Sequence, residues 1–142
     1  MIKPNTQTPA ADELVYFSKF KASLRILGDG LDFDEISRTL GITPTSTRRK
    51  GAGHGLLTKD YDIWIYTPPI ARERPLDEHV MAIWDAVRPH ISYLRTLKQR
   101  FHVDILCGYR SNSGAGGFNV DHRCLGIFSE LEIPFGVSVI IS

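Results

Sequence analysis

The sequence contains little cysteine, no hydrophobic run of membrane-spanning length and no marked excess of charge. Its two cysteines, Cys107 and Cys124, form no CxxC pair, so we expect two buried thiols in a reducing compartment rather than a disulfide framework. The uncharged last ten residues are far shorter than the roughly 20 that a membrane helix needs. The polar stretch 1–12 lacks the apolar core of a signal peptide. These absences predict a cytoplasmic protein without a membrane partner.

The balance of charge bears on the class of partner. The formal net charge is +1, whereas domains that bind nucleic acids usually carry a large positive excess, so the sequence argues against a nucleic-acid partner. The 142 residues suit one domain, which at this size buries a core without disulfides or a structural metal. We expect a flexible N-terminal arm over residues 1–15 and a single α+β domain over residues 16–142.

Alternation of apolar and polar residues predicts the strands. They are expected near residues 16–26, 61–66, 101–110 and 135–141, with a short extended piece at 118–120. The stretch 43–59 has neither a helical nor a strand period and is expected to be a loop.

Apolar stripes of helical period predict the helices. The first runs from a cap at Asp32 to Gly41, the second begins near Pro75, and the last follows Asp121. Pro89 either kinks the second helix or opens a further one at its first turn. The faces that these elements share predict a core of Leu24, Ile26, Ile36, Leu40, Val80, Ile83, Trp84, Ile105, Phe128, Val137 and Val139.

The order of elements predicts the architecture. Helices of this number cover one face of a sheet, so we expect a two-layer α+β sandwich with a mostly antiparallel sheet of about four to five strands and helices on one face. The segment Leu40–Pro44, which ends the first helix, is echoed by Leu131–Pro134 after the last helix. This echo suggests two related halves, although chance alone produces such matches.

Several segments together resemble a known bacterial family. They are Leu24–Asp29, Leu31–Ile36, the run Leu40-Gly41-Ile42-Thr43-Pro44, then Arg49-Lys50-Gly51, the strand with Trp64, and the pattern from Val103 to Ile140. The combination is similar to the domain of unknown function family numbered 4279, over roughly residues 18 to 141. The resemblance implies a single domain and supplies no catalytic residues, because the family brings no activity to carry over.

A basic loop is the most distinctive candidate site. Arg38, Arg48, Arg49, Lys50 and Lys59 are five positive charges in a stretch without an acidic residue between Glu35 and Asp60. Arginine forks beside glycine backbone suit an anionic group or an acidic partner surface. The alternative is a solvated loop whose arginines pair with nearby carboxylates. The predicted anion- or partner-binding residues are Arg48, Arg49, Lys50, Gly51, Gly53 and His54.

Other chemistry has little support in the sequence. The acidic cluster Asp29, Asp32, Asp34 and Glu35 does not match an EF-hand, and the five histidines form no zinc motif. No P-loop, dinucleotide fingerprint or nucleophile elbow is present. We therefore predict no catalytic residues, no metal and no cofactor.

Trp64 suggests an interface. It alternates with Ile63 and Ile65, so one face of their strand exposes an aromatic residue or is covered by another element or another chain. A homodimer follows as a hypothesis.

The sequence favours a non-enzymatic protein-interaction or binding module, such as an adaptor or an immunity-like protein. The alternative is an enzyme or sensor domain that binds an anionic small molecule through the loop 47–55. RNA binding is a third interpretation, supported by the basic segments and opposed by the low net charge.

Overall fold

The computed structural model describes residues 17–51 and 60–142. The expected arm at residues 1–15 lies outside this range. The described elements, in chain order, are β1 (Ser18–Gly28), α2 (Phe33–Leu40), β2 (Ser46–Arg48), β3 (Asp62–Tyr66), α3 (Leu76–Val87), a 3-10 turn (Arg88–His90), α4 (Ile91–Lys98), β4 (His102–Ser111), a 3-10 turn (His122–Leu125), α5 (Gly126–Leu131) and β5 (Gly136–Ile141).

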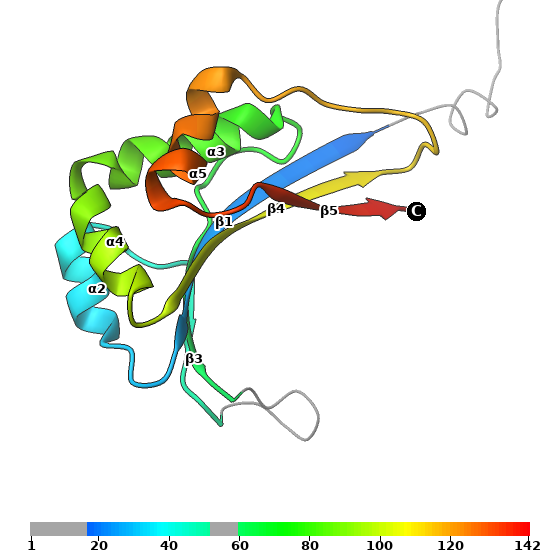
Figure 1. Cartoon of the computed structure of the whole chain (residues 1–142). Coiled ribbons are helices and arrows are strands. Elements are labelled where there is room, and N and C mark those ends of the chain that lie inside the picture. The colour runs from blue at the N-terminus through cyan, green and yellow to red at the C-terminus, as the bar shows by residue number, and fades with distance from the viewer. Residues whose placement is uncertain (1–16, 52–59) are drawn as a thin grey trace, which may run out of the picture.

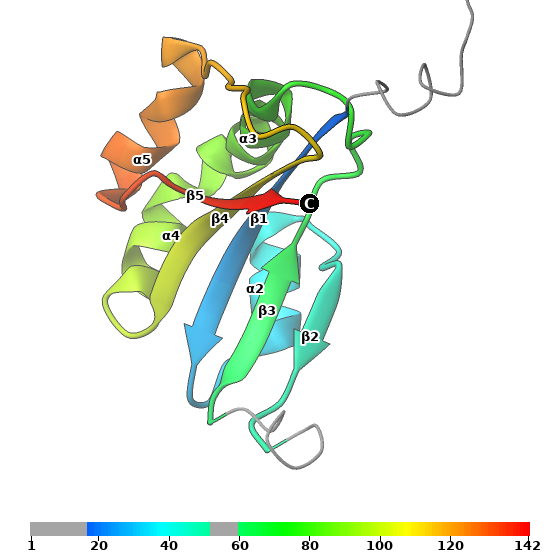
Figure 2. The same ribbon diagram turned by 90° about the vertical axis from the view of Figure 1, so that its right-hand side faces the viewer.

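The five strands form one open sheet in the order β2-β3-β1-β4-β5. β1 pairs antiparallel with β3 and β4, β2 pairs antiparallel with β3, and only the β4–β5 pair is parallel. The helices all lie against one face of the sheet (Figure 1). Figure 2 looks onto the other face, which the helices leave open. The predicted α+β class, with a mostly antiparallel sheet and helices on one face, is confirmed.

The topology is compatible with two related halves. β1 and β4 are each followed by a helix and then by a strand parallel to them, namely β2 and β5. In the first half, β3 is inserted between the two parallel strands. The duplication itself stays a prediction.

Helix α2 begins and ends as its capping residues predict. The side chain of Asp32 accepts a hydrogen bond of 3.0 Å from the backbone N–H of Glu35. Gly41 takes the left-handed conformation, with φ of 69°, and its N–H donates to the carbonyl of Ser37. This turn fixes the helix across the sheet, so that Ile36 and Leu40 enter the core.

Pro89 separates two helices instead of kinking one. It lies in the 3-10 turn Arg88–His90, and α4 starts after it, at Ile91. Proline suits the first turn of such a segment because its missing N–H has no helical acceptor there. The alternative of a further helix after Pro89 is therefore the one observed, but this helix, α4, begins two residues later than Pro89.

The core lies between the sheet and the helices and includes most of the predicted residues. The exceptions are on β5, where Val137 is only partly buried and Val139 is 55% exposed. Alternation identifies which side of a strand a residue faces, but the helices do not extend over the end of β5 (Figure 1). Both cysteines are free and buried, and burial raises the pKa of the Cys107 thiol to about 11.

Two further expectations are corrected. The segment Phe118–Val120 is not a strand, because Phe118 packs on the rings of Phe20 and Tyr109 instead of pairing its backbone. The expected loop after residue 43 contains the short strand β2, which pairs with β3 through Ser46–Arg48. A three-residue strand is too short to give a periodic pattern.

Trp64 is covered by another element of the chain, which is one of the alternatives that the sequence left open. Its indole is fully buried on the helix side of β3, next to Ile26 of β1, and its Nε1–H donates a 3.0 Å hydrogen bond to Ser37 Oγ of α2. Ile63 and Ile65 are the residues of this strand that face outward, because they have the opposite parity. The buried indole therefore forms no exposed aromatic patch, and the homodimer stays a prediction.

Candidate functional site

Two cations of the basic loop, Arg49 and Lys50, have partners within the chain. The Arg49 Nη1 atom donates to the Leu31 carbonyl at 2.6 Å and to Asp62 Oδ2 at 3.1 Å, and its guanidinium lies 3.8 Å from the centre of the Phe33 ring. The Lys50 backbone N–H donates to Asp62 Oδ1 at 2.7 Å, and its ammonium lies 3.4 Å from Asp29. These contacts tie the loop to the turn between β1 and α2.

Asp62 is the centre of this network. Its carboxylate is almost fully buried and also accepts hydrogen bonds from the backbone of Gly30 and Leu31. The hydrogen bond from Lys50 N–H, followed by those from Leu31 and the Arg49 side chain, lowers its pKa below the usual range. Asp62 therefore supplies a negative charge to the loop, as the solvated-loop alternative expects.

Of the remaining predicted loop residues, the structure describes Arg48 and Gly51. Arg48 lies on β2, exposed, beside Arg25 and Tyr61 in a cavity of about 310 Å³ on the open sheet face. Gly51 takes a turn conformation with φ of 82°. Gly53 and His54 lie outside the described residues, so the anion site of loop 47–55 stays a prediction.

The open face of the sheet carries two groups of charged side chains. β1 presents Lys19, Lys21 and Arg25 to it, because these residues alternate with the buried ones. β4 presents Asp104 and Arg110 by the same alternation. The two groups differ in whether their charges are compensated.

At one end of this face, the charges are paired. Arg25 and Asp104 face each other in the β1–β4 register and form two hydrogen bonds, of 2.8 and 2.7 Å. His102 Nε2 lies 3.0 Å from the same carboxylate. Burial, the largest single influence, disfavours the charged form of Asp104, but the hydrogen bonds and the charges of Arg25 and His102 together outweigh it and lower the pKa of Asp104. The hydrogen bond to Asp104 raises the pKa of Arg25. This cluster is a satisfied ion pair that stiffens the two central strands.

At the other end, four cations line a groove of about 290 Å³. They are Lys19 and Lys21 of β1, Arg110 of β4 and Arg72 of the segment after β3, which reaches β1 through a hydrogen bond from Phe20 N–H to the Arg72 carbonyl. Lys19 and Arg110 stand directly opposite each other in the strand register. Within residues 17–51 and 60–142, none of the four forms an ion pair with a carboxylate. We call this the cationic groove.

The floor of the cationic groove is low because Gly108 has no side chain. Gly108 faces Lys21 across the β1–β4 pair and Ser138 across the β4–β5 pair. A Cβ atom added at this glycine would meet nothing within 4 Å. Ser138 and Ile140 of β5 form the opposite wall, so the groove offers one hydroxyl and one apolar side chain beside its cations.

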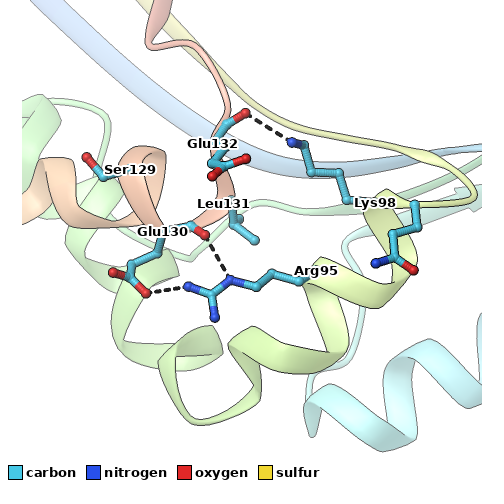
Figure 3. A pocket seen from close by; sticks show the side chains of 7 residues that line it. Arg95, Lys98, Ser129, Glu130, Leu131 and Glu132 are labelled. Atoms are coloured by element: carbon cyan, nitrogen blue, oxygen red, sulfur yellow. Dashed lines mark hydrogen bonds and ion pairs between the residues drawn. The ribbon is translucent and has the colours of Figure 1, made fainter.

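A cavity larger than the cationic groove, of about 530 Å³, lies elsewhere, between α4 and α5. Its cations are already engaged (Figure 3): Arg95 bonds the carboxylate and the carbonyl of Glu130, and Lys98 donates to the Glu132 carbonyl at 3.1 Å. These bonds join the ends of two helices, so we interpret this cavity as structural.

The alternation in β1 already placed its lysines and Arg25 on a polar face, but the sequence alone does not indicate which strands lie beside β1. The cationic groove depends on the pairing of β1 with β4 and on the path of the chain at Arg72, 53 positions along from Lys19. The signal available was the polar parity of Lys19, Lys21 and Arg110, which a correct strand order would have joined.

The fold and its charged face define a two-layer α+β domain with an open five-stranded sheet. The chain belongs to the family described as a domain of unknown function (DUF4279), whose family model matches residues 18–142. The resemblance seen in the sequence is thus confirmed. Comparison with curated proteins and with solved structures finds no match.

Two features are absent from the residues that the structure describes. No helix among them is long and apolar enough to cross a membrane. The part of the chain that the structure describes also has no group of three or more His, Cys, Asp and Glu side chains placed to hold a metal ion.

Proposed function

We propose that this protein is a non-enzymatic interaction module that binds acidic side chains of a partner protein in the cationic groove. The observation that carries this proposal is the uncompensated charge of Lys19, Lys21, Arg72 and Arg110 around one hollow. Like charges directly opposite each other on neighbouring strands destabilise a sheet. A partner that supplies carboxylates removes this cost and adds charge-assisted hydrogen bonds.

The lining of the groove supports binding rather than catalysis. It consists of cations, a serine hydroxyl, apolar atoms and two aromatic residues, without a carboxylate, an imidazole or a thiol to act with them as an acid–base pair. The side chains that most often act as general acids and bases are therefore missing from its walls.

The placement of the aromatic rings favours protein carboxylates over nucleic acid as the ligand of the groove. Phe20 and Tyr109 border the groove, but their rings stack on each other at 5.0 Å and pack with Phe118 on the helix side of the sheet. Single-stranded nucleic acids are usually held by aromatic rings that stack on the bases. The ring of Phe17 lies 5.6 Å from Lys19 Nζ, but Phe17 does not line the groove. The lining residues thus offer cations without such rings, and the formal net charge of +1 supports the same interpretation.

The test is a titration with an acidic peptide of alternating Glu and Val, followed by calorimetry and by amide chemical shifts. The double variant Lys19→Gln, Arg110→Gln should bind it roughly ten- to a hundredfold more weakly, since each charge-assisted contact is worth about 1 kcal/mol at an exposed site. The control Arg38→Gln, Arg100→Gln removes two exposed charges outside the groove and should bind like the natural protein.

A second variant fills the groove without changing its charge. Gly108→Val adds a side chain at a position where a Cβ atom would meet nothing within 4 Å, and valine is favoured in strands. The fold should therefore persist while binding is lost. The proposal is overturned if both groove variants bind the peptide like the control. Tighter binding of single-stranded RNA than of the peptide would also overturn it.

A further inference from the structure

The edge strand β5 is unusually open. It has no charged residue, and the exposed fractions of Val139, Ile140 and Ile141 are 55%, 55% and 52%. Among residues 17–51 and 60–142, no strand pairs with its outer side. These three residues and the neighbouring Phe135 and Leu106 are the large apolar side chains that the described residues expose most.

The direction of the free hydrogen-bonding groups follows from one contact. The N–H of Ser142 donates to the carbonyl of Ser111 on β4 at 3.0 Å. Backbone groups of a strand point alternately to its two sides, so Ile140 and Ser138 also face β4. The N–H and C=O groups of Val137, Val139 and Ile141 therefore point away from the sheet.

Such edges are normally protected. Proteins shorten them, place lysine or proline on them, bulge them or cover them, because an exposed ladder recruits other strands. The opposite edge of this sheet follows that rule, since β2 has three residues and ends at Arg48. β5 has six residues, no proline and no charge. An edge without protection is suited to pair with another chain.

We propose that an extended acidic segment of the partner protein adds to β5 as a sixth strand. The charge of this segment rests on the function proposed above, whereas its strand pairing rests on the β5 edge alone. Apolar side chains of the added strand would cover Val139 and Ile141 on the helix side. Its acidic side chains would lie on the open face, about 10 Å from β4, a distance that Arg110 and a glutamate span together.

Charge complementarity favours this occupant over a second copy of the chain. A second β5 would bring another uncharged strand to the edge, and with it a second set of the same four cations to the same face. Pairing two copies would add no carboxylate for the cationic groove. An acidic strand from another protein satisfies both the ladder and the charges.

The decisive variant is Val139→Pro. It removes an N–H that points away from β4, so the β4–β5 ladder keeps its hydrogen bonds while the outer ladder loses one. The matched control Val139→Thr keeps the N–H and the shape of the side chain. We expect the alternating Glu/Val peptide to bind Val139→Pro at least tenfold more weakly than Val139→Thr.

Two readouts separate this proposal from binding in the groove alone. Citrate, a small carboxylate that needs no ladder, should shift the amide resonances of the groove equally in Val139→Pro and in the natural protein. The double variant Lys19→Gln, Arg110→Gln should lose the response to both ligands. If the citrate response is absent throughout, the function proposed above fails, whereas an unchanged peptide affinity in Val139→Pro contradicts only the strand addition.

Hydrogen exchange in the natural protein tests the ladder without any variant. The amides of Val139 and Ile141 should exchange fast in the free protein and at least tenfold more slowly with saturating peptide. Peptide binding without this protection overturns the proposal. So does a dimer, seen by analytical ultracentrifugation, that Val139→Pro dissociates and the peptide does not.

Discussion

Lys19 and Arg110 are two positive charges directly opposite each other on the central strands β1 and β4. Their repulsion is a cost that the folded protein carries, and it can be removed by one substitution. Arg110→Glu turns the pair into an attractive one and leaves the exposed position and strand register unchanged. We therefore predict that this variant is more stable than the natural protein while losing the acidic partner.

The expected size follows from the geometry. Opposite residues have Cβ atoms about 5 Å apart, and two unit charges about 8 Å apart in water interact by about 0.5 kcal/mol before screening. Salt reduces this to about 0.2 kcal/mol at 0.15 M and about 0.4 kcal/mol at 0.01 M. Reversing one charge replaces a repulsion by an attraction of equal size, so the change in free energy is twice the interaction energy. The charges of Lys21 and Arg72 add to this change in the same direction. Arg110→Glu should thus gain about 0.5 kcal/mol at 0.15 M and about 1 kcal/mol at 0.01 M.

Urea unfolding followed by circular dichroism at the two salt concentrations measures this gain. At low salt, the gain corresponds to a rise in Tm of about 2–4 °C. The neutral variant Arg110→Gln should give about half of it, and the double variant Lys19→Glu, Arg110→Glu should give less than the sum of the single variants. A loss of stability at low salt in Arg110→Glu, or a gain that does not depend on salt, would refute the electrostatic reasoning.

Two further predictions concern the framework behind this face. Ser37→Ala removes the acceptor of the buried Trp64 N–H and should cost about 1–3 kcal/mol in a urea titration, and a loss below about 0.5 kcal/mol would contradict that hydrogen bond. The carboxyl of Asp62 has a lowered pKa in the folded protein, so its contribution to stability is complete above its unfolded pKa, near 4, and is lost as the pH falls through the folded value. Asp62→Asn should therefore show a shallower loss of Tm below pH 4 than the natural protein, and equal slopes would contradict the network around Asp62.

Elements that are specified locally were predictable from the sequence. The Asp32 cap and Gly41 define α2 by their own hydrogen bonds, whatever the rest of the chain does. The alternation in β4 is that of a strand buried on one side, and the structure buries its apolar residues Val103, Ile105, Cys107 and Tyr109. The period of a pattern and the chemistry of a cap act over a few residues, and a sequence displays both.

Features that depend on neighbours were not predictable. For Trp64 the sequence left open exposure, cover by another element or cover by another chain, because both faces of its strand are apolar. Only the packing of α2 over one face decides which residue is buried. Val139 has the parity of a core residue, but it lies beyond the reach of the helices. Alternation assigns a side of the sheet, whereas burial depends on what covers that side.

The candidate site had the same limitation. The loop around Arg49 has the highest density of cations in the sequence, but the fold places the buried carboxylate of Asp62 beside it. The cations of the groove are thinly spread along the chain, and the fold brings them together without a carboxylate. A count of charges along a sequence therefore identifies a basic segment, while the distribution of partners decides where charge is left uncompensated.

The cationic groove and the unpaired edge of β5 lie at the same end of the sheet, and each is unfavourable for the free protein. Repulsion across β1 and β4 weakens the fold, and an uncharged, exposed strand invites aggregation. Each cost is removable by a single substitution, an acid at Arg110 or a charge on β5, without disturbing the core. Stability alone therefore gives no reason for a chain to carry both costs. A partner strand with carboxylates on one side and apolar residues on the other gives such a reason, because it compensates the charges and closes the ladder in one binding event.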